Sequence, residues 1–279
     1  MASAQITVRD DLGFAVELDR PAQRIVSLAP HVTELLFAAG AGERIVGTVD
    51  YSDFPPEAQR VPSVGSYTGV DMEALLGLRP DLVIAWQSGN IPRQLEQIVA
   101  LGVPVYRSEP RHLADVAAAL RHFGLLAGTE TVANQAAASF EFRWRALQSR
   151  YATRPSVRVF YQIWHRPLMT INGEHLISEV MSLCGGQNVF VDVSGLAPAV
   201  SLEAVVLADP EVIVASGMGE SRPQWLDQWA RWPDLTAVAR GNLFFIPPAL
   251  LQRHTPRILD GAERLCEALE KARSRRIVL

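Results

Sequence analysis

The sequence lacks the short motifs that mark the common classes of enzyme active site. It contains no GxxxxGKS/T phosphate loop, no GxGxxG turn after a strand, no GxSxG nucleophile elbow and no HExxH zinc motif. A GMGES turn at 217–221 follows a predicted strand, but a lone GxG is most often an ordinary turn. We therefore expect a binding protein with no catalytic cofactor, and an enzyme built on an α/β cleft is the disfavoured alternative.

Histidine also gives no sign of a metal site. The six histidines show no spacing typical of metal ligands, so we expect no resident metal. His112 and His122 lie in an amphipathic segment and His175 opens a predicted helix, which favours surface and structural roles. The other three fall where predicted strands lead into helices, the edge at which open α/β sheets bind ligands. They are His31, His165 and His254.

Two further absences narrow the range of partners. No apolar run approaches the ~18–20 residues that would span a bilayer, so direct membrane insertion is not expected. The net charge is −4, from 26 basic and 30 acidic residues, so binding to nucleic acid is not expected. The opening MASAQ has neither region of a signal peptide, which fits either a chain without one or an expression start on a trimmed mature protein.

Cysteine is scarce, and its role is open at this point. Cys184 and Cys266 lie in no CxxC motif and beside no histidine pattern. Two buried apolar thiols and one disulfide are both compatible with this placement. A disulfide would close a loop of about 82 residues, restrict the unfolded chain by ~4–5 kcal/mol and require an oxidising compartment.

The sequence does contain a regular alternation of strand and helix patterns. After a short hairpin at 5–20, buried-strand runs alternate with helices up to residue 126, and the helix at 90–102 starts with Asn90 as its N-cap. A Pro- and Gly-rich segment at 50–69 is long for a loop and resembles a binding loop. The alternation predicts an α/β fold with mainly parallel sheets covered by helices on both faces.

A long helix separates two such series. Residues 129–150 contain no Gly or Pro and are rich in Ala, Glu, Arg and Gln, which predicts about six helical turns. A second strand–helix series begins at VRVFYQI. We therefore predict two Rossmann-like lobes, residues 5–127 and 154–279, joined by one connecting helix over 128–153. A length of 279 residues agrees with roughly two domains.

The clearest internal signal is a repeated helix and strand. VDMEALLGLRPDLVIA at 70–85 and VSLEAVVLADPEVIVA at 200–215 align without a gap. An Asp and a Ser, two residues before the glutamates, are good N-caps and place Glu73 and Glu203 in the first turn of each helix. A carboxylate there gains ~0.3–1 kcal/mol from the helix dipole, which explains either glutamate singly. A matched pair also suits docking to a partner with two-fold symmetry.

Aromatic side chains gather at predicted strand ends in both lobes. They are Tyr51, Tyr67, Trp86, Trp164 and His165. Such residues can simply cap a core, but their number at loop edges better fits a flat, largely apolar ligand held between the lobes. Arg253, before the last helix, forms either a surface ion pair or a hydrogen bond to amides or carboxylates of the ligand.

Several phrases together resemble the periplasmic vitamin B12 (cobalamin)-binding proteins of bacterial ABC importers. They are RIVSLAPHVTELLFAAGAGERIVG, DYSDFPP, LRPDLVIAWQSGN, CGGQNVF and TPRI, and the likeness covers about residues 22–270. Each phrase also suits the wider group that carries haem and ferric siderophores, whereas YSDFPP with AWQSGN and CGGQNVF favours cobalamin. The resemblance implies two lobes bridged by one long helix, a ligand cleft between the lobes and no catalytic activity.

The resemblance also implies a ligand, partners and a location. Cobalamin or a related corrinoid is the expected transported ligand, and the dimeric permease of an ABC transporter is the expected partner. The carrier is expected to be monomeric and periplasmic, with its signal peptide removed. The glutamates that engage permease arginines in this family match Glu73 and Glu203, and its paired cysteines match Cys184 and Cys266.

The ligand residues of the family carry over unevenly. Tyr51, Trp86 and Arg253 match positions of the cobalamin site, whereas Tyr67 stands where the family pattern has tryptophan. In the second lobe, three expected side chains are replaced: a tryptophan, an acidic residue and a phenylalanine. The residues found there are Ala197, Ala249 and Met169.

These departures have two consequences for the predicted site. We expect Trp164 and His165 to compensate for the altered wall of the second lobe. The departures from the family pattern also leave an alternative ligand, which is haem, another tetrapyrrole or a siderophore. If the ligand is haem, Tyr67 or His165 is expected to be its axial ligand.

Overall fold

The chain divides into two compact units in this computed structural model. Unit 1 comprises the residues up to 110 together with 114–141, and unit 2 comprises 111–113 and the residues from 142 onward. The residues that the structure describes are 5–66, 68–217, 219 and 221–276. The three-part division predicted from the sequence stays a proposal, and each unit is described by itself.

The boundary between the units falls inside one long helix. This helix, α5 (Glu130–Tyr151), has 22 residues and is therefore ~33 Å long at ~1.5 Å per residue. It follows α4 (Leu113–Ala127) after a turn at Gly128, whose φ of 65° is readily adopted only by glycine. The predicted long helix is confirmed.

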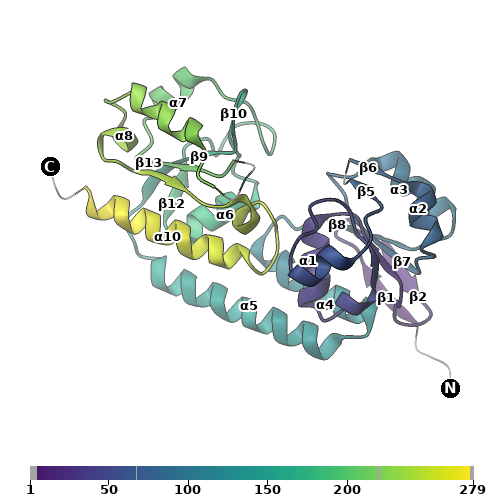
Figure 1. The fold of residues 1–279 in the computed structure, drawn as a ribbon. Helices are drawn as coiled ribbons and strands as arrows, with labels where there is room; N and C mark the ends of the chain where they lie inside the picture. Colours follow the sequence, from purple (N-terminus) through teal and green to yellow (C-terminus); the bar gives the residue numbers. More distant parts are fainter. Residues whose placement is uncertain (1–4, 67, 218, 220, 277–279) are drawn as a thin grey trace. The chain divides into compact units, whose positions relative to one another are not determined.

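Unit 1 is built on a four-stranded parallel sheet in the order β4-β3-β7-β8, of which β7 and β8 are labelled in Figure 1. The strands are β3 (Ile25–Ser27), β4 (Ile45–Gly47), β7 (Leu82–Trp86) and β8 (Val105–Ser108). α2 (Met72–Gly77) and α3 (Pro92–Ala100) cover one face, and α1 (Pro30–Ala38) and α4 lie on the other. The smaller elements are β1 (Ile6–Arg9), β2 (Ala15–Leu18), η1 (Gly42–Arg44), η2 (Pro56–Arg60), β5 (Gly65–Ser66) and β6 (Gly69–Val70).

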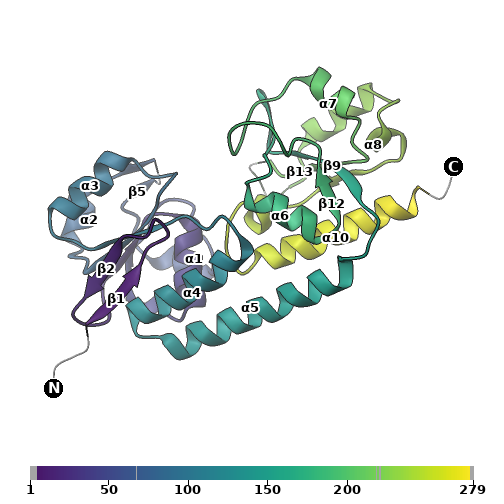
Figure 2. The same ribbon diagram turned by 180° about the vertical axis from the view of Figure 1, so that it is seen from behind.

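Unit 2 repeats this plan with the parallel order β12-β9-β13-β14. Its strands are β9 (Val157–Gln162), β12 (Gly186–Asn188), β13 (Val212–Ala215) and β14 (Leu243–Phe245). α6 (Leu176–Leu183) and α10 (Ile258–Ser274) lie on one face, and α7 (Leu202–Ala208) and α8 (Thr236–Ala239) on the other (Figures 1 and 2). The remaining elements are β10 (Trp164–His165), β11 (Leu168–Met169), η3 (Gln224–Arg231) and α9 (Pro248–Leu251).

The two sheets have the same strand order by sequence, 2-1-3-4, which confirms the predicted pair of parallel α/β lobes. Their central third strands, β7 and β13, are almost entirely buried. Because helices cover both faces of a parallel sheet, both faces of its central strands are buried. These strands are therefore continuous apolar runs in the sequence. The carboxyl ends of the strands are left to carry polar and aromatic side chains.

Two details differ from the sequence prediction. Asn90 is not the N-cap of α3, because the helix begins at Pro92 with Ile91 before it. The buried Asn90 side chain instead ties two strand ends together: its Oδ1 accepts from the N–H of Trp86 at 2.7 Å and its Nδ2 donates to the carbonyl of Leu28 at 3.0 Å. The helix predicted near 222–230 is a 3-10 helix, η3.

A disulfide joins Cys184 and Cys266, with an S–S distance of 2.03 Å. It links the end of α6 to the middle of α10, two helices on one face of the unit 2 sheet. The pairing implied by the resemblance is confirmed. Nearby, Arg273 donates to the carbonyls of Cys184 and Pro155, so α10 is also fastened at its carboxyl end.

Among the helices of the described residues, none is both long and apolar enough to cross a bilayer. The GMGES turn lies partly outside the described residues, which omit positions 218 and 220.

Candidate functional site

In unit 1 the best-defined candidate is Trp86, the last residue of β7. Its half-buried ring meets the ring of His31 edge to face, with 5.4 Å between centroids and an interplanar angle of 86°. The same ring lies over Gly89, where a Cβ would fall 1.9 Å from Trp86 Cε3. A glycine is therefore required at this position, and the loop and Asn90 together hold the indole in place before any ligand binds.

Tyr51 is presented differently, on a strained and exposed loop. Its side chain is 74% exposed and its φ is 65°, a left-handed conformation that costs a non-glycine residue of order 1 kcal/mol. Backbone hydrogen bonds on both sides hold it there, from Asp50 N to Gly65 O at 2.9 Å and from Ser52 N to Val49 O at 3.2 Å. Tyr67, the other predicted aromatic of this loop, lies outside the described residues.

In unit 2 the predicted pair, Trp164 and His165, forms the two-residue strand β10, which pairs antiparallel with β11. The Nε1 of Trp164 donates to the carbonyl of Arg166 at 3.0 Å, and the two rings lie 5.0 Å apart. His165 also stacks on Trp225 of η3, with 5.6 Å between centroids and 10° between planes. The structure therefore brings these two predicted residues together and adds a third aromatic ring.

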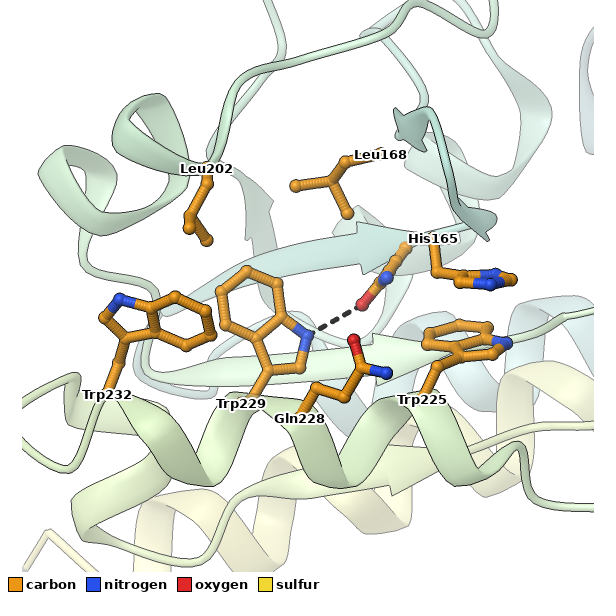
Figure 3. A pocket seen from close by; sticks show the side chains of 8 residues that line it. His165, Leu168, Leu202, Trp225, Gln228, Trp229 and Trp232 are labelled. Carbon is orange, nitrogen blue, oxygen red and sulfur yellow. Dashed lines mark hydrogen bonds between the residues drawn. The ribbon is translucent and has the colours of Figure 1, made fainter.

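His165 forms one end of an aromatic pocket inside unit 2 (Figure 3). Figure 3 shows Leu168 and Leu202 facing a row of side chains from η3 and its end. The pocket is lined by Gln162, His165, Leu168, Leu202, Trp225, Gln228, Trp229 and Trp232. Trp229 is fixed by a 2.8 Å hydrogen bond from its Nε1 to Oε1 of the buried Gln162. We call this set of residues the tryptophan pocket.

Sequence reasoning missed most of the tryptophan pocket. It identified His165 but treated the segment of η3 only as a covering helix. The available signal was the clustering of tryptophan: three of the six in the chain, Trp225, Trp229 and Trp232, lie within eight residues. Since each indole is large and amphipathic, such a cluster next to a predicted ligand edge indicates a binding wall.

The remaining predicted ligand positions lie elsewhere in unit 2. Arg253 is half-buried, follows α9 and is not among the residues that line the tryptophan pocket. Met169, in place of the expected phenylalanine, is half-buried in β11 directly opposite Trp164. Ala249 is the second residue of α9.

The two glutamates occupy matching positions at the starts of α2 and α7. Oδ1 of Asp71 accepts from Ala74 N at 3.0 Å, and Oγ of Ser201 accepts from Ala204 N at 3.1 Å, so both predicted N-caps are confirmed. Along 71–78 and 201–208 the alternation of exposed and buried residues is identical, and Glu73 and Glu203 are exposed. Hydrogen bonds from its own backbone N–H and from Ser201 hold the pKa of Glu203 below its ordinary value.

The ends of these two helices match as well. Arg79 and Asp209, which are equivalent in the repeat, are both left-handed, with φ of 47° and 38°. In unit 1 Arg24 donates from Nε to the carbonyl of Leu78 at 2.8 Å, and in unit 2 Arg158 donates from Nη2 to the carbonyl of Ala208. The repeat thus extends from the sequence to caps, backbone conformation and supporting hydrogen bonds.

A family model described as periplasmic binding protein matches residues 25–250. The chain belongs to the periplasmic binding protein family. Proteins of this family bind and carry ligands as components of transport systems, which confirms the expectation that the chain is not an enzyme. Among the described residues, no group of three or more His, Cys, Asp or Glu is placed to hold a metal ion.

Within the family the chain is similar to proteins with named ligands. The vitamin B12-binding protein of Vibrio cholerae is 37% identical over 253 residues, which cover 90% of this chain and 91% of that protein. The crystal structure of the periplasmic vitamin B12-binding protein of Vibrio cholerae matches with a TM-score of 0.83 and 36% identity, over 91% of this chain and 98% of that one. A periplasmic heme-binding protein from Roseiflexus matches with a TM-score of 0.79 and 25% identity, over 90% and 99% of the two chains.

Proposed function

We propose that this chain is a periplasmic carrier that binds cobalamin, or a related corrinoid, and delivers it to the permease dimer of an ABC importer. The observation that carries the proposal is the likeness to vitamin B12-binding proteins over nine tenths of both chains. On this account the carrier acts as a monomer in the periplasm, after removal of a signal peptide.

The aromatic side chains at the strand ends suit a corrinoid. A corrin ring is broad, flat and largely apolar, with amide groups around its rim. Trp86 in unit 1 and Trp164 in unit 2 offer flat apolar surface for the ring, and the exposed side chain of Tyr51 is proposed to add to it. Tyr67 is proposed to contribute as well. The guanidinium of Arg253 is proposed to donate hydrogen bonds to the amide oxygens.

The second candidate ligand is haem. It is favoured by the likeness to the heme-binding protein from Roseiflexus and by the imidazole of His165 at the edge of unit 2. The two ligands need different contacts, because haem would be held by a direct bond from His165 or Tyr67 to iron, whereas cobalamin needs only packing and hydrogen bonds. The identity of 25% against 37% places cobalamin first.

Calorimetric titration of the purified protein with cyanocobalamin and with haemin separates the two. We expect cyanocobalamin to bind with micromolar or tighter affinity and haemin to bind weakly, with no shift of its Soret band. Tight binding of haemin with a Soret shift, and no heat from cyanocobalamin, would show that the ligand is haem and not cobalamin.

Docking to the permease is assigned to the two matched glutamates. Glu73 and Glu203 are exposed, begin equivalent helices and carry negative charge toward a partner. Arginines of a two-fold symmetric permease would pair with both, because equivalent surfaces on the two units can meet equivalent surfaces on two subunits. This assignment places docking on α2 and α7 and ligand binding at the strand ends.

A further inference from the structure

The helices α2 and α7 expose apolar side chains one turn after each glutamate. Leu76 follows Glu73 at the third position, and Val206 and Leu207 follow Glu203 at the third and fourth. Residues at these spacings lie side by side on one face of a helix, with ~5–6 Å between their Cβ atoms. Each helix therefore carries a carboxylate and apolar surface on the same exposed face. We name these two faces the acidic–apolar stripes.

Packing within the units does not explain the apolar residues of the stripes. The inward positions of the two helices, Leu75 and Val205, are already buried in the cores of their units. Leu207 is 88% exposed, the largest fraction among the exposed large apolar side chains that the structure describes. Single exposed apolar residues are common on protein surfaces. Exposure at the equivalent positions Leu76 and Val206 of a repeat instead indicates a surface that a partner covers.

In unit 1 the apolar surface continues from α2 onto α3, the helix beside it (Figures 1 and 2). Position 77, which is equivalent to Leu207, is a glycine, and an open groove of about 450 Å³ lies between the two helices. The groove is lined by Met72, Leu76, Gln97, Ala100 and Leu101. Unit 2 thus offers a protruding leucine and unit 1 an apolar groove, each on a helix that also carries a glutamate.

The charge of the stripes restricts what can cover them. Contact between the stripes of two copies of this chain would bring glutamate against glutamate, in a protein of net charge −4, and like-charge repulsion opposes such contact. An anionic membrane surface attracts basic segments, and neither α2 nor α7 contains Lys or Arg. A protein surface with a cationic group next to an apolar side chain complements both parts of each stripe.

We propose that the acidic–apolar stripes bind the permease dimer by apolar contact as well as by charge. The proposal rests on the proposed function and adds the chemistry of the partner: each permease subunit presents an apolar side chain beside the cationic group that pairs with the glutamate. Interfaces commonly combine an apolar centre with a polar, charged rim. Leu207 and the groove beside Leu76 form the apolar part, and Glu73 and Glu203 form the charged part.

Surface plasmon resonance with permease in nanodiscs, at about 0.1 M and about 0.5 M NaCl, separates the two parts, because salt screens exposed charges and not apolar contact. Leu207→Gln should weaken binding about fivefold or more, and Leu76→Gln about threefold, by the same ratio to wild type at both salt concentrations. For Glu73→Ala with Glu203→Ala, the ratio should fall toward one at the higher concentration. Glutamine is a good helix former, so both helices should still fold.

Phe142→Gln is the matched control, because Phe142 is 75% exposed on α5, outside both stripes. It should bind the permease like the wild type, and every variant should keep its affinity for cyanocobalamin. Wild-type affinity of Leu207→Gln for the permease, or an equal loss in Phe142→Gln, would overturn the apolar contact and leave the proposed function standing. Failure of the wild type to bind the permease at all would overturn the proposed delivery to a permease.

The two other occupants of the stripes are tested in parallel. The wild type should not bind empty nanodiscs and should be a monomer in light scattering. Binding to empty nanodiscs that Leu207→Gln abolishes would assign the stripes to lipid. A dimer that Leu207→Gln dissociates would assign them to a second copy of the chain. Either result would overturn the proposal.

Discussion

The segments 71–86 and 201–216 share the same helix and strand structure and differ at the carboxyl ends of their strands. Both begin with a capped helix, place a glutamate in its first turn and end the helix with a left-handed residue before proline. Both then enter a buried central strand. The shared part is the scaffold and the face that carries the glutamates.

The difference starts where the strands end. β7 ends in Trp86, which packs over Gly89, whereas the equivalent position in unit 2 is the buried Ser216, whose hydroxyl donates to the carbonyl of Ile246 at 3.3 Å. The aromatic wall of unit 2 comes instead from β10 and η3. The repeat therefore preserves the helix, its exposed glutamate and the central strand, while the aromatic side chains at the strand ends differ between the units.

The largest expected effect on binding concerns the two glutamates that we propose dock to the permease. Glu73→Ala with Glu203→Ala should weaken binding to the permease about ten- to a hundredfold, or ~1.4–2.8 kcal/mol, and leave cobalamin affinity unchanged. The two single variants should cost similar amounts, since the two sites are equivalent. Surface plasmon resonance with permease in detergent or nanodiscs measures these effects.

A charge-matched control for that experiment is Glu43→Ala with Glu267→Ala, which removes one exposed glutamate from each unit away from α2 and α7. An equal loss in the control would show that net charge alone drives docking. Loss of cobalamin binding in the Glu73→Ala and Glu203→Ala double variant would contradict a docking role for these residues.

The second effect concerns pH and is confined to unit 2. His175 caps α6 by accepting from Ile177 N at 3.1 Å, whereas the equivalent first helix of unit 1, α1, has no side-chain cap. Burial and the nearby His254 lower the pKa of His175 to about 4, from an ordinary value of 6.5. Because the pKa of His175 is lower in the folded protein than in the unfolded chain, its contribution to the free energy of unfolding is complete above pH 6.5. That contribution falls by roughly 3 kcal/mol as the pH drops toward 4.

Replacement of His175 by asparagine keeps a capping side chain and removes the titration. Urea unfolding measures the free energy of unfolding of both proteins between pH 7.5 and pH 4. Over this range we expect it to fall by roughly 3 kcal/mol less for His175→Asn than for the wild type. Parallel pH profiles of the two proteins would refute the role of this histidine.

The smallest effect distinguishes the two left-handed residues. Arg79→Gly should stabilise the protein by ~0.5–1 kcal/mol, since glycine adopts positive φ without strain. Asp209→Gly should instead destabilise it by ~1 kcal/mol, because the Asp209 carboxylate accepts from Thr236 N at 2.8 Å and Thr236 Oγ1 at 2.7 Å. Chemical denaturation measures both, and equal changes would mean that the backbone strain alone matters.

Local patterns predicted much of this fold. Apolar runs identified β3, β7, β9 and β13, and the composition of 129–150 identified α5, because these signals depend on residues near one another in the chain. The N-caps Asp71 and Ser201 were predictable for the same reason. The cysteine pairing was predicted from the family resemblance, because the spacing alone was compatible with both two buried thiols and one disulfide.

The features that were missed depend on distant residues. Asn90 failed as an N-cap because its side chain bonds to Leu28, 62 positions away. The tryptophan pocket draws its walls from β9, the β10–β11 hairpin, α7 and η3, so no single stretch of sequence describes it. The strand order that makes the two units equivalent likewise appears only when the strands pair.

A crystal structure of the protein with bound cyanocobalamin tests the central claim most directly, because the claim assigns ligand and docking to different parts of a repeated scaffold. The account predicts that the corrinoid contacts Trp86 from unit 1 and Trp164 or His165 from unit 2, while Glu73 and Glu203 remain exposed. A corrinoid that contacts only one unit, or that covers either glutamate, would contradict it.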